Sequence, residues 1–199
     1  KPQAIEGLVT QVAGPVVLRV IDDLPTIVVV AKAADQVMVQ LFRVEGGDLM
    51  PVRVIKPGFP VAGIGPVLAD GRLLLQVTVP VATAGAAWRP AGGCLMAASL
   101  ENSAAHVMGA RLAPGAQVLA VADVDGDGKA EVVLGADDAL WLVGLPGQET
   151  RAPVRLARPT SGAPLAGVEV RDLDGDGKAD LAAWGPHGVG RLLQQGGKP

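Results

Sequence analysis

Residues 123–131 read DVDGDGKAE and residues 172–180 read DLDGDGKAD, so one acidic pattern occurs twice, 49 positions apart. In each copy, three aspartates alternate with other residues and an acid stands at the ninth position. Carboxylates crowded in this way repel one another by a few kcal/mol for each close pair, and a bound cation would relieve that repulsion. A carboxylate-rich set of oxygen ligands with flexible geometry favours Ca²⁺ over Mg²⁺. The pattern therefore predicts two calcium sites.

We expect the alternating aspartates to point inward and the glycines to let the backbone curl, so that a backbone carbonyl and the ninth-position acid complete each shell. The first predicted ligand set is Asp123, Asp125, Asp127, the Lys129 carbonyl and Glu131. The second predicted ligand set is Asp172, Asp174, Asp176, the Lys178 carbonyl and Asp180.

Two other interpretations of the loops fit the sequence less well. An EF-hand begins in the same way but needs an acid at position twelve and a helix on each side. Position twelve is Leu134 in the first copy and Ala183 in the second, and the flanking segments have the short apolar runs of β-strands. The other alternative is a pair of solvated acidic turns without metal, but three alternating aspartates and a ninth acid, twice, exceed what a turn requires.

Composition excludes several classes of protein. The 199 residues are 49% hydrophobic with a net charge of −3, and eight of the 20 acidic residues lie in the two loops, so two calcium ions would change the formal charge to +1. The sequence has no block of basic residues that would predict nucleic-acid binding, and it has no apolar run long enough for a transmembrane segment. Cys94 is the single cysteine, which excludes an internal disulfide. The chain begins at Lys1 without methionine, as expected after removal of an N-terminal signal or from a cut chain.

The period of the loops extends through the chain. Aspartates that precede a strand-like segment recur at Asp22, Asp70, Asp123 and Asp172, and the first two corners are short and lack the other ligands. Within one period, the clearest strand-like segments are 118–122, 131–136, 139–145 and 152–159. Four short antiparallel strands in about 50 residues are typical of a β-propeller blade.

The sequence thus predicts an all-β fold, a single β-propeller domain over residues 1–199 with four blades of four antiparallel strands. The predicted blades are 15–60, 61–115, 116–165 and 166–199, the last completed by a strand at 5–13. We expect this N-terminal strand to close the ring by pairing with residues 188–195, which would remove the open sheet edges.

The strings DVDGDGKAEVVLG and DLDGDGKADLAAWG resemble the FG-GAP and VCBS-type repeats of calcium-binding propellers related to integrin α-subunits. The resemblance is specific over 118–136 and 168–185. Over the first hundred residues it is limited to the architecture of the repeat. It implies calcium as a structural ligand, an extracytoplasmic setting, and a role in adhesion, recognition or complex assembly.

The expected function is non-catalytic. His106 and His187 lie 81 residues apart and belong to no recognised catalytic motif. The apolar segment 80–93 contains Trp88 and Arg89, which we predict to contact a partner. We therefore expect an accessory subunit of a periplasmic, extracellular or cell-surface complex, with other protein subunits as partners. Glycan binding by a lectin-like propeller is the alternative, although aromatic residues make up only 3% of the chain.

Overall fold

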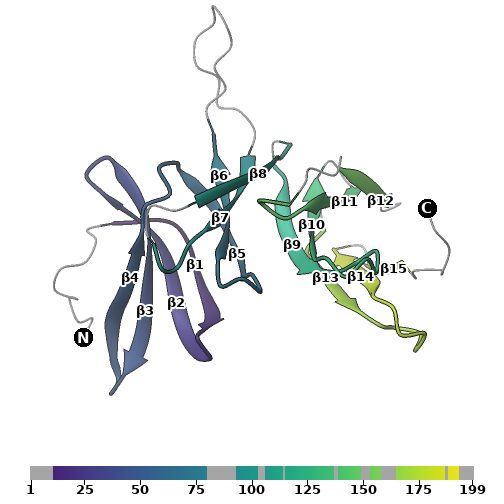
Figure 1. The fold of residues 1–199 in the computed structure, drawn as a ribbon, viewed down its shortest axis with the longest axis horizontal. Helices are drawn as coiled ribbons and strands as arrows, with labels where there is room; N and C mark the ends of the chain where they lie inside the picture. Colours follow the sequence, from purple (N-terminus) through teal and green to yellow (C-terminus); the bar gives the residue numbers. More distant parts are fainter. Residues whose placement is uncertain are drawn as a thin grey trace, which may run out of the picture. The chain divides into compact units, whose positions relative to one another are not determined.

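The computed structural model is all-β, with four antiparallel sheets among the described residues (Figure 1). The chain divides into two compact units, Lys1–Met108 and Gly109–Pro199. The prediction of an all-β fold is confirmed, and the single propeller domain with its blade limits stays a prediction. The structure describes residues 11–79, 93–102, 106–113, 115–136, 139–148, 153–157, 165–186 and 188–192.

The first unit holds two four-stranded sheets, and their strands follow one another in chain order. The first sheet contains β1 (Gln11–Ile21), β2 (Leu24–Ala33), β3 (Gln36–Glu45) and β4 (Asp48–Ile55). The second sheet contains β5 (Val61–Val67), β6 (Leu73–Thr78), β7 (Gly93–Ala98) and β8 (His106–Arg111), and the boundary between the units falls within β8.

These two sheets enclose the core of the first unit. Leu73, Leu75 and Ile55 are among its fully buried side chains, and each contributes about 1.5–3 kcal/mol by leaving water. Strand β1 packs against β5, and there the Arg19 guanidinium donates to the carbonyl oxygens of Gly65 (2.8 Å) and Ile64 (2.9 Å). Burial lowers the pKa of Arg19. Main-chain oxygens of one sheet are therefore tied to a side chain of the other.

The second unit holds the third and fourth sheets. The third sheet contains β9 (Gln117–Ala122), β10 (Glu131–Ala136), β11 (Ala139–Gly144) and β12 (Val154–Ala157). The fourth sheet contains β13 (Gly167–Arg171), β14 (Asp180–Gly185) and β15 (Gly188–Leu192). The four strands predicted for this repeat are confirmed to within a few residues.

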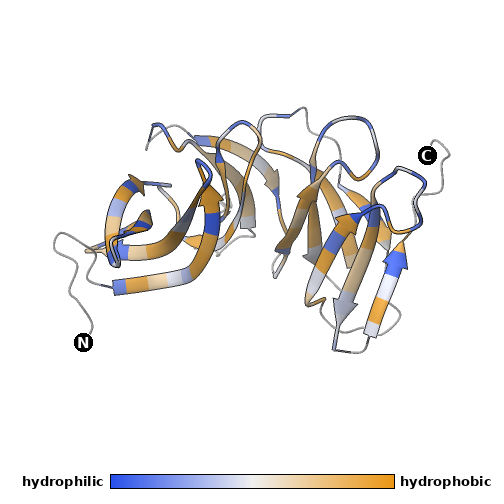
Figure 2. Cartoon of the chain, turned by 90° about the horizontal axis from the view of Figure 1, so that it is seen from below, coloured by the Kyte–Doolittle hydropathy of each residue, from blue (hydrophilic) through white to orange (hydrophobic). Residues whose placement is uncertain are grey.

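The third and fourth sheets pack face to face, with β9 against β13. Their shared core contains Val133, Leu140 and Leu142 from the third sheet, and Val168 and Leu181 from the fourth. Strands β9, β10 and β11 are short apolar runs, and in Figure 2 the orange segments lie mainly along strands. In the described part of the chain, no helix is long and apolar enough to cross a membrane.

The predicted closing strand is wrong in the part that the structure describes. Residues 5–10 lie outside the described residues, but Gln11 pairs with Lys32 and Val12 with Ala31 in the first sheet, not with residues 188–195. The reason is local. Asp22 and Asp23 form a two-residue turn with positive φ (52° and 59°), and a hairpin closed by two residues costs far less chain entropy than joining distant ends. In the part of the chain that the structure describes, no sheet closes into a ring.

Candidate metal centres

The two acidic loops occupy the same corner of neighbouring sheets. The first loop, residues 123–130, connects β9 to β10, and the second, residues 172–179, connects β13 to β14. The strand pair on either side fixes the loop ends, because Ala122 pairs with Glu131 and Arg171 pairs with Asp180. Each ninth-position acid is therefore the first residue of a strand.

In the first loop, Asp123 organises the backbone. Its Oδ1 accepts a hydrogen bond from the amide of Gly126 (2.7 Å), and its Oδ2 accepts one from the amide of Gly128 (2.8 Å). Gly126 and Gly128 have φ of 76° and 85°, a region that residues with a Cβ rarely enter. The glycines thus let the chain wind around the carboxylate, as predicted.

The second loop repeats this arrangement. The carboxylate of Asp172 accepts from the amides of Gly175 (2.6 Å) and Gly177 (2.9 Å), and these bonds lower the pKa of Asp172. Asp174 then accepts from the amide of Asp176 (3.1 Å). The counterpart in the first loop is the bond from the amide of Asp127 to Asp125 (3.2 Å). The two loops are therefore built by the same hydrogen bonds.

The ninth-position acids are the buried members of each loop. Glu131 is 4% exposed and accepts from the amide of Val124 (3.0 Å), while Asp180 is 1% exposed and accepts from the amide of Leu173 (2.8 Å). Burial raises the pKa of Glu131; the bond from Val124 opposes the shift, and the charges of the three loop aspartates add to it. A positive charge in the loop would favour the ionised form of this carboxyl.

Three carboxylates converge in each loop. Oxygens of Asp123, Asp125 and Asp127 lie within 4.8 Å of one another, as do oxygens of Asp172, Asp174 and Asp180. Calcium binds oxygen at 2.3–2.6 Å, so two ligands of one ion can lie about 5 Å apart. A carboxylate oxygen that accepts one amide retains a second lone pair for a metal. The residues present therefore fit a hard cation such as calcium.

The two clusters contain six of the ten predicted ligands. Glu131 lies outside the first cluster, and Asp176 lies outside the second, where its Oδ2 is 3.4 Å from the Nζ of Lys178. The amides of Lys129 and Lys178 donate to the preceding aspartates, each at 2.9 Å, and the role of their carbonyls stays a prediction. Trp88 and Arg89, the predicted partner contacts, lie outside the described residues.

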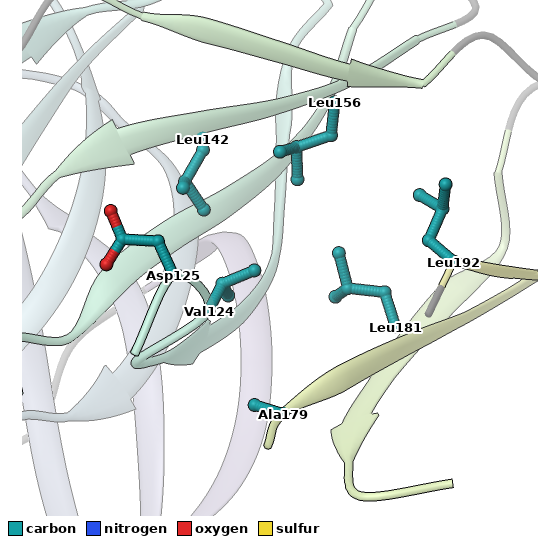
Figure 3. A pocket seen from close by; sticks show the side chains of 7 residues that line it. All are labelled: Val124, Asp125, Leu142, Leu156, Ala179, Leu181 and Leu192. Carbon is teal, nitrogen blue, oxygen red and sulfur yellow. The ribbon is translucent and has the colours of Figure 1, made fainter. Parts of the chain in front are cut away.

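A cavity between the third and fourth sheets was missed by the sequence reasoning. It has a volume of about 240 Å³, and its lining is mainly aliphatic (Figure 3). The lining residues are Val124, Asp125, Leu142, Leu156, Ala179, Leu181 and Leu192. The sequence carries no signal for this cavity, because its leucines come from four different strands and only the fold brings them together.

The comparison with protein families identifies the same segment as the loop geometry. Residues 123–183 match the model of the FG-GAP-like repeat, which spans both loops and the strands between them. The chain therefore carries an FG-GAP-type repeat, as the sequence predicted. No curated protein and no solved structure matches the chain. The match offers no support for the carbohydrate-binding alternative.

Proposed function

We propose that this chain is a non-catalytic, calcium-stabilised protein-interaction module. An FG-GAP-like repeat suggests a β-propeller-like interaction domain, and the successive antiparallel sheets are compatible with propeller blades. Under this proposal the module is an accessory subunit of a complex, and calcium holds the corners of its last two blades.

The observation that carries the calcium proposal is the duplicated carboxylate cluster. Two loops in neighbouring sheets hold three carboxylates each within 4.8 Å, with the same hydrogen bonds beneath them. A turn does not require carboxylates to converge, and the repulsion between them costs free energy when no cation is present. In the first loop we assign Asp123, Asp125 and Asp127 as ligands, with Glu131 as a buried charge directed at the same loop.

Calcium would stabilise the second unit by binding only the folded loops. With free calcium a hundredfold above the dissociation constant, each site adds about 2.7 kcal/mol to the free energy of unfolding. Free calcium reaches such levels outside the cytosol, so the proposal includes a periplasmic, extracellular or cell-surface location. In this role, calcium neutralises the loop carboxylates and holds the hairpin corner, and no further chemistry is required of it.

The non-catalytic part of the proposal is supported by the environments of two reactive groups. The Nε2 of His106 lies 2.7 Å from the carbonyl oxygen of Lys56, so this ring nitrogen is in hydrogen-bond contact with the backbone. Cys94 is 5% exposed and packs in the core of the first unit. Neither group lies next to the acidic loops in sequence, and both have a structural role.

Calcium titration tests the proposal directly. Isothermal calorimetry on the chelator-treated 199-residue chain should give two calcium ions per chain, and Asp125→Ala or Asp174→Ala should each reduce this to one. Asp48→Ala, which removes an exposed carboxylate from the first unit, is the matched control and should leave two. Absence of binding at millimolar calcium would overturn the assignment.

A further inference from the structure

The fourth sheet has an open edge at its last strand. Within the described residues this sheet has the order β13-β14-β15, whereas each of the other three has four strands. Among the residues that the structure describes, no strand pairs with the outer side of β15, and residues 188–191 are exposed. Edge strands commonly carry charged or proline residues that block pairing, but β15 reads Gly-Val-Gly-Arg-Leu and has one charged side chain and no proline.

The cavity between the third and fourth sheets reaches this edge. Leu192 of β15 and Leu181 of β14 form one wall, and Leu142 and Leu156 of the third sheet form the opposite wall. Figure 3 shows these leucines turned toward one another and the carboxylate of Asp125 turned away from them. The space next to Leu192 is thus suited to an aliphatic side chain.

A strand added outside β15 would place side chains in register with those of β15. Residues directly opposite in adjacent strands share a face, about 5 Å apart. The residue opposite Leu192 would therefore face the cavity, and the residue opposite the exposed Arg191 would lie on the outer face, where an acidic side chain is favoured. On that outer face Val189 is 78% exposed beside Trp184, which is 40% exposed.

We propose that the edge of β15 binds an extended segment of a partner protein as the fourth strand of this sheet. The segment would place an aliphatic residue in the cavity and an acidic residue opposite Arg191. Main-chain hydrogen bonds would provide affinity, and the cavity would provide specificity. This inference rests on the proposed interaction function, because it names the surface and the kind of partner.

The cavity also adjoins both acidic loops. Val124 and Asp125 belong to the first loop, and Ala179 belongs to the second. Ordering of the loops by calcium would therefore fix part of the cavity wall, and calcium is expected to strengthen binding of the strand. Calcium binding itself does not require the edge to be occupied.

The test uses a fluorescein-labelled peptide of about nine residues, a typical strand length, in which leucine and valine alternate with glutamate and threonine. Fluorescence anisotropy should show saturable binding to the 199-residue chain, and deuterium exchange should fall at 188–192. The same peptide with N-methyl groups on alternate amides is the control, and it should bind at least tenfold more weakly. Equal binding of both peptides would show that no strand is added and would overturn the proposal.

Two substitutions at Leu156 test the cavity. Leu156→Trp fills it and should weaken peptide binding at least tenfold, whereas Leu156→Ala enlarges it and should retain binding. Circular dichroism and thermal melting check that both variants fold. An equal loss in the two folded variants would exclude the cavity from recognition and overturn the proposal.

Two further results would assign the edge to another occupant. If the outward amides of 188–192 are already protected in the chain alone at low concentration, the edge is covered by the chain itself. If the chain forms a dimer that the peptide dissociates, the occupant is a second copy. Either result overturns the assignment to a partner. Two bound calcium ions without peptide binding would refute only the strand site, and peptide binding without calcium binding would refute only the calcium proposal.

Discussion

In the first unit, the aspartate at the corner between the first two strands of each sheet pairs with an arginine. Asp22 lies 2.9 Å from Arg43, and Asp70 accepts from the Nε of Arg72 at 2.8 Å. In the second unit, the corner aspartates lie among other carboxylates instead. The same position in the repeat is therefore neutralised by a side chain in one unit, and in our proposal by a metal ion in the other.

This difference has a thermodynamic consequence. An arginine is part of the chain, so its contribution to stability does not depend on the calcium concentration. A calcium ion contributes only as far as its free concentration exceeds the dissociation constant. The second unit is therefore expected to respond to calcium, and the first unit is expected to be indifferent to it.

Removing calcium should have the largest effect. With each site contributing about 2.7 kcal/mol, chelation should lower the melting temperature of the second unit by on the order of 10–20 °C per site, for a unit of fewer than 100 residues. Deuterium exchange followed by mass spectrometry should locate the change, with faster exchange in β10 and β14 and unchanged exchange in β2 and β6. Equal acceleration in both units would contradict the comparison.

Removing one ligand should have the next largest effect. Asp174→Ala deletes a carboxylate of the second cluster and its bond to the amide of Asp176. In calcium we expect a loss of up to about 2.7 kcal/mol. In chelator we expect at most the loss of one exposed hydrogen bond, about 1 kcal/mol, and relief of the repulsion between the carboxylates offsets part of it. Denaturant unfolding in both conditions measures the difference. Asp48→Ala is the control, and identical losses with and without calcium would argue against ligation by Asp174.

Some features were predictable because their determinants are close together in sequence. Strands β9, β10 and β11 follow from short apolar runs that lie between turn-forming residues, and the loop carboxylates converge because they belong to nine consecutive residues. The pairing of Gln11 depended on competition between a near and a distant partner, which the pattern could not decide. Arg43 lies on β3 and Asp22 lies in the turn between β1 and β2, 21 residues earlier, so their ion pair could be identified only from the folded structure.

Removing the lysine beside the second cluster should give a smaller effect of opposite sign. The Nζ of Lys178 lies 3.4 Å from Asp176, and under our proposal it would compete with calcium for that carboxylate. Because this pair is partly exposed, Lys178→Ala should tighten calcium binding only about two- to fivefold, measured by calorimetry. Lys32→Ala, an exposed lysine of the first unit, should leave the affinity unchanged. Weaker calcium binding in Lys178→Ala would mean that the lysine supports the site.

The smallest effect is expected at the arginine corner of the second sheet. Hydrogen bonds from Arg72 hold the pKa of Asp70 below its ordinary value of 3.8, so this pair stabilises the fold above that pH and loses its contribution as the pH falls through the folded pKa. The pair is partly exposed, so Arg72→Ala should cost less than about 1 kcal/mol at neutral pH. Carbon NMR of the Asp70 carboxyl should show its pKa rising toward 3.8 in this variant, equally in calcium and in chelator. A shift that appeared only in calcium would place a metal at this corner too, and the contrast between the two units would then be wrong.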